Sequence, residues 1–166
     1  MQGNGVVDFL LSGRGAGFVL LFLAAWCVTG YLAAWMSGWR VLAQLFPCER
    51  EFDGQRWRFQ SGAMRWSTNY NGVLTMGANR DGIYLAMFFA FRPGHPPLFI
   101  PWNEITTSDR RRLFAGTQFV LGREAQIPLW VFKKMGDRLL AFRPAEDDAM
   151  QGLYSRPGLE DPRPIA

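Results

Sequence analysis

The sequence contains few of the residues that carry metal or redox chemistry. Its 166 residues include two cysteines and one histidine, His95. Two cysteines cannot form a disulfide framework, and with a single histidine they do not supply a zinc ligand set. We interpret Cys27 and Cys48 as small, partly buried thiols, with lipidation near a membrane as the alternative for Cys48. We therefore expect no metal ion and no cofactor.

Motifs of enzymes are also missing. The segment Gly77-Ala78-Asn79 lacks the Gly-Lys-Ser/Thr ending of a phosphate-binding loop, and the carboxylates are scattered, with no pair that suggests hydrolysis. His95 stands in Gly94-His95-Pro96-Pro97, with no serine or cysteine partner beside it. We interpret His95 as a residue that hydrogen-bonds a backbone carbonyl and fixes this loop, with catalysis as the alternative. The sequence therefore predicts a protein that is not an enzyme.

What the sequence does contain is one long run without charge. Residues 15–39 read GAGFVLLFLAAWCVTGYLAAWMSGW and lie between Arg14 and Arg40. A helix needs about 20 apolar residues to cross a bilayer core of about 30 Å, and its backbone groups must be paired within the helix. The run predicts a transmembrane helix over 15–39, after a short N-terminal segment, 1–14.

Two alternatives exist for this run. A cleaved signal peptide has a shorter apolar core, a basic start and a small-residue cleavage site, whereas this run is longer and ends in tryptophans. A buried helix of a soluble protein has a polar face at 3.6-residue spacing, which this run lacks. We favour an uncleaved anchor.

The C-terminal end of the run carries candidate membrane contacts. Residues whose amphipathic or basic side chains favour the headgroup level are Tyr31, Trp35, Trp39 and Arg40. Gly30, Ala34 and Gly38 recur every four residues and form a stripe that allows close helix approach. We predict that the stripe packs against partner helices, and the alternative is that small residues are simply common in membrane helices.

Positive charge sets the predicted orientation. Arg14 alone precedes the run. The basic residues that follow within about twenty positions are Arg40, Arg50, Arg56 and Arg58. Because Lys and Arg favour the cytoplasmic side, we expect a single-pass membrane protein with its N-terminus outside and its C-terminal domain in the cytoplasm.

Residues 40–142 are predicted to form one small β domain. Short apolar or alternating runs are separated by Gly, Asn, Asp and Pro, which is the pattern of strands and turns. We predict turns at 61–62, 68–72 and 78–82, a central strand over 83–91, a hairpin of 117–121 with 127–132, and a closing helix over 133–142. The predicted fold class is α+β: one transmembrane helix, then a small antiparallel β barrel or sandwich closed by a C-terminal helix.

Charge is unevenly distributed after the anchor. Residues 40–143 hold 15 Lys and Arg against 8 Asp and Glu. The tail over 143–166 is acidic and rich in proline and glycine, and we predict that it is disordered. Candidate contacts of the basic domain with headgroups or a protein partner are Arg110, Arg111, Arg112, Arg123, Lys133 and Lys134. The alternative is a solvated surface, and we expect no nucleic-acid binding because the aromatics lie on apolar strands.

One segment carries a resemblance. Gly82 to Ile105 reads GIYLAMFFAFRPGHPPLFIPWNEI, and it resembles a family of bacterial membrane-anchored proteins that share a G-[IL]-Y-L … F-R-x-G-H-P-P-L-[FL]-I-P-W-x-E-I motif. The order of elements over 40–142 is similar to that of bacterial pleckstrin-homology-like (PH-like) domains. This resemblance implies a location in the bacterial inner membrane and a domain of about seven strands with a closing helix. It implies no reaction, because a fold does not determine a function. Membrane-fused relatives often have a pair of membrane helices, whereas this sequence has one span.

Together these patterns predict a protein that acts by binding. We expect a non-catalytic accessory or scaffold subunit of a larger membrane protein complex. The alternative is a module at the inner membrane surface that binds anionic lipid headgroups. The expected partners are membrane lipid and a larger integral membrane protein complex.

Overall fold

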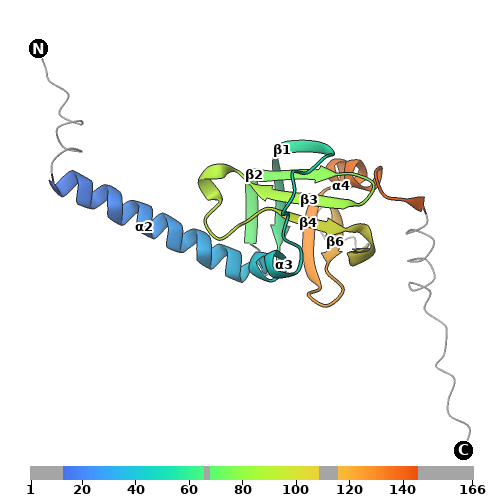
Figure 1. Cartoon of the computed structure of the whole chain (residues 1–166), viewed down its shortest axis with the longest axis horizontal. Helices are drawn as coiled ribbons and strands as arrows, with labels where there is room; N and C mark the ends of the chain where they lie inside the picture. Colours follow the sequence, from blue (N-terminus) through green and yellow to red (C-terminus); the bar gives the residue numbers. More distant parts are fainter. Residues whose placement is uncertain (1–12, 66–67, 109–115, 146–166) are drawn as a thin grey trace, which may run out of the picture.

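A long helix leads into a β domain in the computed structural model, which describes residues 13–65, 68–108 and 116–145 (Figure 1). The helices are α2 (Gly13–Met36), α3 (Trp39–Leu45) and α4 (Lys133–Leu140), with short 3₁₀ turns η1 (Phe89–Phe91) and η2 (Trp102–Glu104). The strands are β1 (Gln55–Met64), β2 (Thr68–Ala78), β3 (Gly82–Met87), β4 (Leu98–Pro101), β5 (Ile105–Ser108), β6 (Gly116–Leu121) and β7 (Ile127–Phe132). Residues 1–12 of the predicted N-terminal segment (1–14) and residues 146–166 of the predicted tail (143–166) lie outside the described residues.

Helix α2 stands clear of the β domain over its N-terminal half (Figure 1). Within the described ranges it is the one helix long and apolar enough to cross a membrane, over Gly15–Met36. It ends earlier than the uncharged run does. Gly38 adopts a left-handed backbone with φ of 80°, a conformation that glycine adopts without strain and that commonly ends helices. The chain therefore turns after Met36, and Trp39 begins α3 instead of extending α2.

The strands form one antiparallel sheet in the order β4-β3-β2-β1-β7-β6-β5, which curls into a nearly closed barrel. Strand β1 links its two halves, because it pairs with β2 along its length and with β7 over Gly62 to Met64. The turns predicted at 61–62 and 68–72 lie inside β1 and β2 instead. A Cβ at Gly62 would stand 3.1 Å from the carbonyl oxygen of Trp130, so this glycine permits close strand approach and does not mark a turn.

The predicted hairpin and closing helix are confirmed. β6 pairs with β7 from Gly116↔Phe132 to Leu121↔Ile127, and α4 buries Met135 and Leu139 against the barrel core. The predicted strand over 83–91 ends at Met87 and gives way to η1. An apolar N-terminal helix, an antiparallel β barrel and a C-terminal helix thus agree with the α+β class.

The folded domain extends one residue beyond its predicted end. The guanidinium of Arg143 donates hydrogen bonds to the carbonyl oxygen of Ile105 and to Thr107 Oγ1, and it lies 5.9 Å from the ring centre of Trp102. Arg143 therefore belongs to the barrel, whereas we had assigned it to the acidic tail.

Candidate functional site

The most specific arrangement of side chains lies where α2 meets the β domain, which we call the joint. The connection between β3 and β4, residues 88–97, runs along the C-terminal half of α2. Trp26 Nε1 donates a 2.8 Å hydrogen bond to the carbonyl oxygen of Ala90. One helical repeat further on, a Cβ at Gly30 would lie 2.9 Å from the carbonyl oxygen of Pro93. Helix and loop therefore touch at two heights, which fixes their relative orientation.

The centre of the joint is a buried cluster of polar aromatic side chains. Trp39 and His95 are 0% and 1% exposed, and their ring centres lie 5.2 Å apart. Trp39 Nε1 donates a 2.8 Å hydrogen bond to the carbonyl oxygen of Pro96. Tyr70, on β2, lies edge-on to both rings. The helix turn, the β3–β4 loop and the barrel thus meet in one cluster.

Hydrogen bonding defines the protonation of His95. Its Nδ1 lies 3.1 Å from the carbonyl oxygen of Pro93, and a carbonyl oxygen only accepts, so Nδ1 carries a proton. In the neutral ring Nε2 then accepts the hydroxyl proton of Tyr70 at 2.9 Å. Burial lowers the pKa of His95 from its ordinary value, and the Pro93 hydrogen bond acts in the opposite sense. The interpretation of His95 as a residue that bonds a backbone carbonyl and fixes its loop is confirmed.

Tyr70 is a second buried polar side chain of the joint. Burial raises the pKa of its hydroxyl to about 12, and the side chain of Ser37 acts in the opposite sense. Ser37 is itself buried in the turn between α2 and α3, where its Oγ donates to the carbonyl oxygen of Ala34 and accepts from the backbone N–H of Trp39. Neutral side chains therefore hold the joint together at neutral pH.

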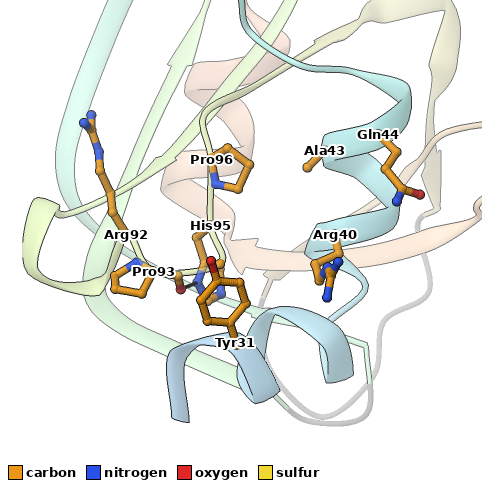
Figure 2. A pocket seen from close by; sticks show the side chains of 9 residues that line it. Tyr31, Arg40, Ala43, Gln44, Arg92, Pro93, His95 and Pro96 are labelled. Carbon is orange, nitrogen blue, oxygen red and sulfur yellow. Dashed lines mark hydrogen bonds between the residues drawn. The ribbon is translucent and has the colours of Figure 1, made fainter. Parts of the chain in front are cut away.

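An open groove lies beside the joint (Figure 2). It has a volume of about 580 Å³, and its lining comes from the end of α2, from α3 and from the β3–β4 loop. Arg40 and Arg92 are its two cationic residues, and both are exposed. Figure 2 shows Arg40 beside Tyr31 and Arg92 beyond Pro93, so the two cations flank the groove on opposite sides. A groove of this size with positive charge at both sides suits a small anionic group.

The predicted membrane-interface residues divide into two groups. Tyr31, Trp35 and Arg40 are exposed near the end of α2, and the exposed fractions of Tyr31 and Trp35 are 54% and 70%. Trp39 differs from the expectation, because the turn at Gly38 directs it into the domain core, where it has no exposed surface.

The predicted helix-packing stripe faces the protein's own domain. Gly30 touches Pro93, and a Cβ at Gly94 would lie 3.2 Å from Cβ of Ala34. Gly38 lies in the turn after α2, where a Cβ would stand 2.7 Å from Cδ1 of Ile127. Close approach is thus what these small residues permit, but the neighbour along the described chain is a loop and a strand of the β domain. The contact with partner helices stays a prediction.

The described residues of the predicted basic surface do not lie together in one place. Arg110, Arg111 and Arg112 lie outside the described residues. Arg123 precedes β7, where its backbone N–H donates to Glu104 Oε2 and its Nε donates to the carbonyl oxygen of Asn103. Lys133 and Lys134 follow the other end of β7. Six strand residues, about 20 Å, therefore separate Arg123 from the two lysines.

Sequence reasoning did not identify Trp26, Ser37, Tyr70 and Arg92 as parts of a site. Tyr70 lies in the segment 68–72 that the sequence predicts as a turn. Their partners are distant in sequence: 64 residues separate Trp26 from Ala90, and 25 separate Tyr70 from His95. One signal in the sequence was His95 in its Gly-His-Pro-Pro segment, because a buried histidine needs hydrogen-bond partners for its ring nitrogens.

A second groove, of about 520 Å³, is lined by residues 47–53 with Asn79, Asp81 and Phe99. Burial raises the pKa of the Cys48 thiol in this groove, although Arg56 and a hydrogen bond to Arg50 act in the opposite sense. Over the described ranges no three His, Cys, Asp or Glu side chains gather in a way that could hold a metal ion.

Comparison of the chain with protein-family models, with curated proteins and with solved structures finds no match. The joint, the two grooves and the exposed surfaces are therefore the features from which we infer a function.

Proposed function

We propose that the protein is a single-span membrane protein whose PH-like domain is a non-catalytic accessory or scaffold subunit of a larger membrane protein complex. The observation that carries this proposal is the joint. Hydrogen bonds from Trp26 and Trp39 and the close approach at Gly30 fix the domain on its helix. A domain held in this way offers its surfaces at one height and one orientation relative to the bilayer, which is what a scaffold requires.

The remaining surface of α2 supports the same role. The domain occupies the side of the helix that carries Gly30 and Ala34. Large apolar side chains elsewhere on the helix are exposed, among them Phe18 at 64%, Leu20 at 66% and Leu21 at 71%. In a bilayer these side chains are available to lipid and to partner helices.

The chemistry of the joint favours a structural role over catalysis. Both ring nitrogens of His95 are engaged, one with Pro93 and the other with Tyr70. A general base must lie within hydrogen-bond reach of the substrate proton that it abstracts, whereas His95 is 1% exposed and its Nε2 faces the buried hydroxyl of Tyr70. His95 instead holds three segments of the chain together. This structural role supports the proposal that the protein acts by binding.

The proposed location is the bacterial inner membrane. A single arginine precedes the span and several follow it closely, so the positive-inside rule puts the β domain in the cytoplasm. The strand number and the closing helix are compatible with the proposed PH-like identity of the domain.

Purification of the full-length chain from native membranes in mild detergent tests the proposal. We expect a stoichiometric integral membrane protein to co-elute and to be identified by mass spectrometry. A protein that elutes alone, at the size of a monomer, in detergents that preserve other membrane complexes would overturn it.

The groove beside the joint favours a second candidate function, the binding of an anionic lipid headgroup. Arg40 and Arg92 flank the groove near the end of α2, where a spanning helix meets the headgroups. Each well-placed arginine contributes about 1 kcal/mol of attraction to an anionic membrane surface. In this role the protein would recognise charged lipid next to its own anchor.

A further inference from the structure

We propose that the turn between β3 and β4 is inserted into the lipid leaflet beside α2. The turn carries the exposed rings of Phe88, Phe89 and Phe91, and the ring of Phe59 in strand β1 lies beside that of Phe88. We call these four phenylalanines the aromatic tip. The exposed fractions of Phe59, Phe88, Phe89 and Phe91 are 66%, 37%, 73% and 36%. The rings of Phe59 and Phe88 lie 5.9 Å apart, and those of Phe88 and Phe89 lie 4.6 Å apart. A contiguous apolar patch of this kind marks a contact with lipid or with another protein. The inference rests on the proposed membrane span.

The position of the aromatic tip along α2 favours lipid. Trp26 donates its hydrogen bond to Ala90, and its ring lies 5.0 Å from that of Phe91. At 1.5 Å per residue, Trp26 lies about 15 Å from the helix end at Met36. The part of the candidate span before this contact, from Gly15 to Trp26, measures about 17 Å, too short for a bilayer core of about 30 Å. A helix that spans with residues 15–36 therefore carries the aromatic tip into the bilayer.

The backbone of the aromatic tip suits this depth, because polar groups in lipid need partners within the protein. The N–H of Phe88 donates to Val73, and the N–H groups of Phe91 and Arg92 donate to Phe88 and Phe89. The carbonyl oxygen of Ala90 accepts from Trp26. Arg92, directly after the tip, is exposed, and its long side chain allows the charge to reach the headgroups while its stem stays in the apolar layer.

The backbone at Phe59 is a second, independent observation. Phe59 has φ of 56°, in the left-handed region that a bulky side chain rarely adopts, and it lies at an irregularity in the pairing of β1 with β2. This strained position holds a ring that is two-thirds exposed beside Phe88. Such strain persists where the surrounding fold imposes it and is often linked to function. Here it completes the apolar surface of the tip.

Spin labels on the full-length chain in phospholipid vesicles test the insertion. In a Cys27→Ser, Cys48→Ser background, single labels are placed at Phe89→Cys, at Leu21→Cys within the span, and at Phe132→Cys. Phe132 is a matched control, because it is 68% exposed. It lies at the end of β7 opposite Ile127, the residue that packs near Gly38 at the joint. Collision with oxygen, which concentrates in lipid, is compared with collision with a water-soluble nickel complex.

We expect the label at position 89 to behave like the label at 21, accessible to oxygen and protected from nickel, and the label at 132 to collide with nickel. Nickel access at 89 with protection at 21 would overturn the insertion and leave the membrane span intact. Nickel access at both would overturn the span and the insertion together.

A photoreactive phenylalanine analogue at position 89 keeps the ring and covers the case in which the cysteine variant does not fold. In native membranes, we expect lipid adducts from position 89 and none from position 132. Adducts of position 89 with another protein, and none with lipid, would assign the aromatic tip to a protein partner and overturn the proposal.

Discussion

Trp39 Nε1 and the carbonyl oxygen of Pro96 are joined by a 2.8 Å hydrogen bond across 57 residues of sequence. Trp39 opens α3 immediately after α2, and Pro96 belongs to the loop that packs on α2. The indole of Trp39 therefore links α2, the β3–β4 loop and the barrel. The rigid attachment of the β domain to α2 depends on this contact and on its neighbours.

Replacement of Trp39 by phenylalanine tests the contribution of this hydrogen bond. Trp39→Phe keeps an aromatic ring in the core but removes the donor to Pro96, and we expect the free energy of unfolding to fall by about 1–3 kcal/mol. Thermal unfolding of the full-length chain in detergent measures the change. Trp35→Phe is the matched control, since Trp35 is 70% exposed one turn earlier, and it should leave the unfolding temperature unchanged. Equal effects of the two variants would contradict the joint.

Glycine at position 30 is expected to be required for the close approach of helix and loop. A Cβ at Gly30 would lie 2.9 Å from the backbone oxygen of Pro93, whereas a Cβ at Gly17 would meet nothing within 4 Å. We expect Gly30→Ala to destabilise the joint by about 1–3 kcal/mol and Gly17→Ala to have little effect. The unfolding temperature of the full-length chain in detergent, compared between the two variants, reports the loosening. Equal unfolding temperatures would argue against the packing.

Acidification is expected to weaken the joint through His95. Burial lowers the pKa of His95 below the value of about 6.5 that it has in an unfolded chain, so the unfolded chain binds the proton first as pH falls. The stability that neutral His95 contributes is therefore complete above about pH 6.5 and decreases below it. Unfolding temperatures compared at about pH 7.5 and 5.5 should fall further in the wild type than in His95→Gln, which does not titrate. Identical pH dependence would disprove this role.

Headgroup binding at the groove predicts selectivity for anionic lipid. In detergent, a short-chain phosphatidylglycerol should raise the unfolding temperature more than the matching phosphatidylcholine does, and salt should reduce the difference. Arg40→Gln with Arg92→Gln should abolish it. Arg80→Gln, a change of an exposed arginine that does not line the groove, should retain it. Equal responses to both lipids would reject the second candidate function.

Local patterns in the sequence were sufficient for the elements that depend on neighbouring residues. The uncharged run predicted α2, and the alternating residues around Gly122 predicted the β6–β7 hairpin. The segment after Phe132 was predicted as the closing helix and forms α4. The end of α2 depended on one dihedral angle at Gly38, which the continuous run of apolar letters does not encode.

The joint was beyond sequence reasoning because its contacts are distant along the chain. The small residues Gly30 and Ala34 indicate that another segment packs closely on α2. The same pattern of small residues permits packing of a partner helix and of the protein's own loop, so it does not distinguish between them. Residues 88–91 of the aromatic tip were assigned to the central strand 83–91, because their sequence FFAF continues the apolar residues of β3. Only the fold shows that β3 ends at Met87 and that the rings after it are exposed.

Site-specific photo-cross-linking from α2 in native membranes tests the central claim most directly. A photoreactive residue at Leu21, which is 71% exposed, is compared with one at Phe132. We expect Leu21 to yield one discrete product that contains the same integral membrane protein in every preparation, and Phe132 to yield no such product. A helix that forms only lipid adducts at Leu21 and at its other exposed positions would contradict the account of this protein as a subunit of a membrane complex.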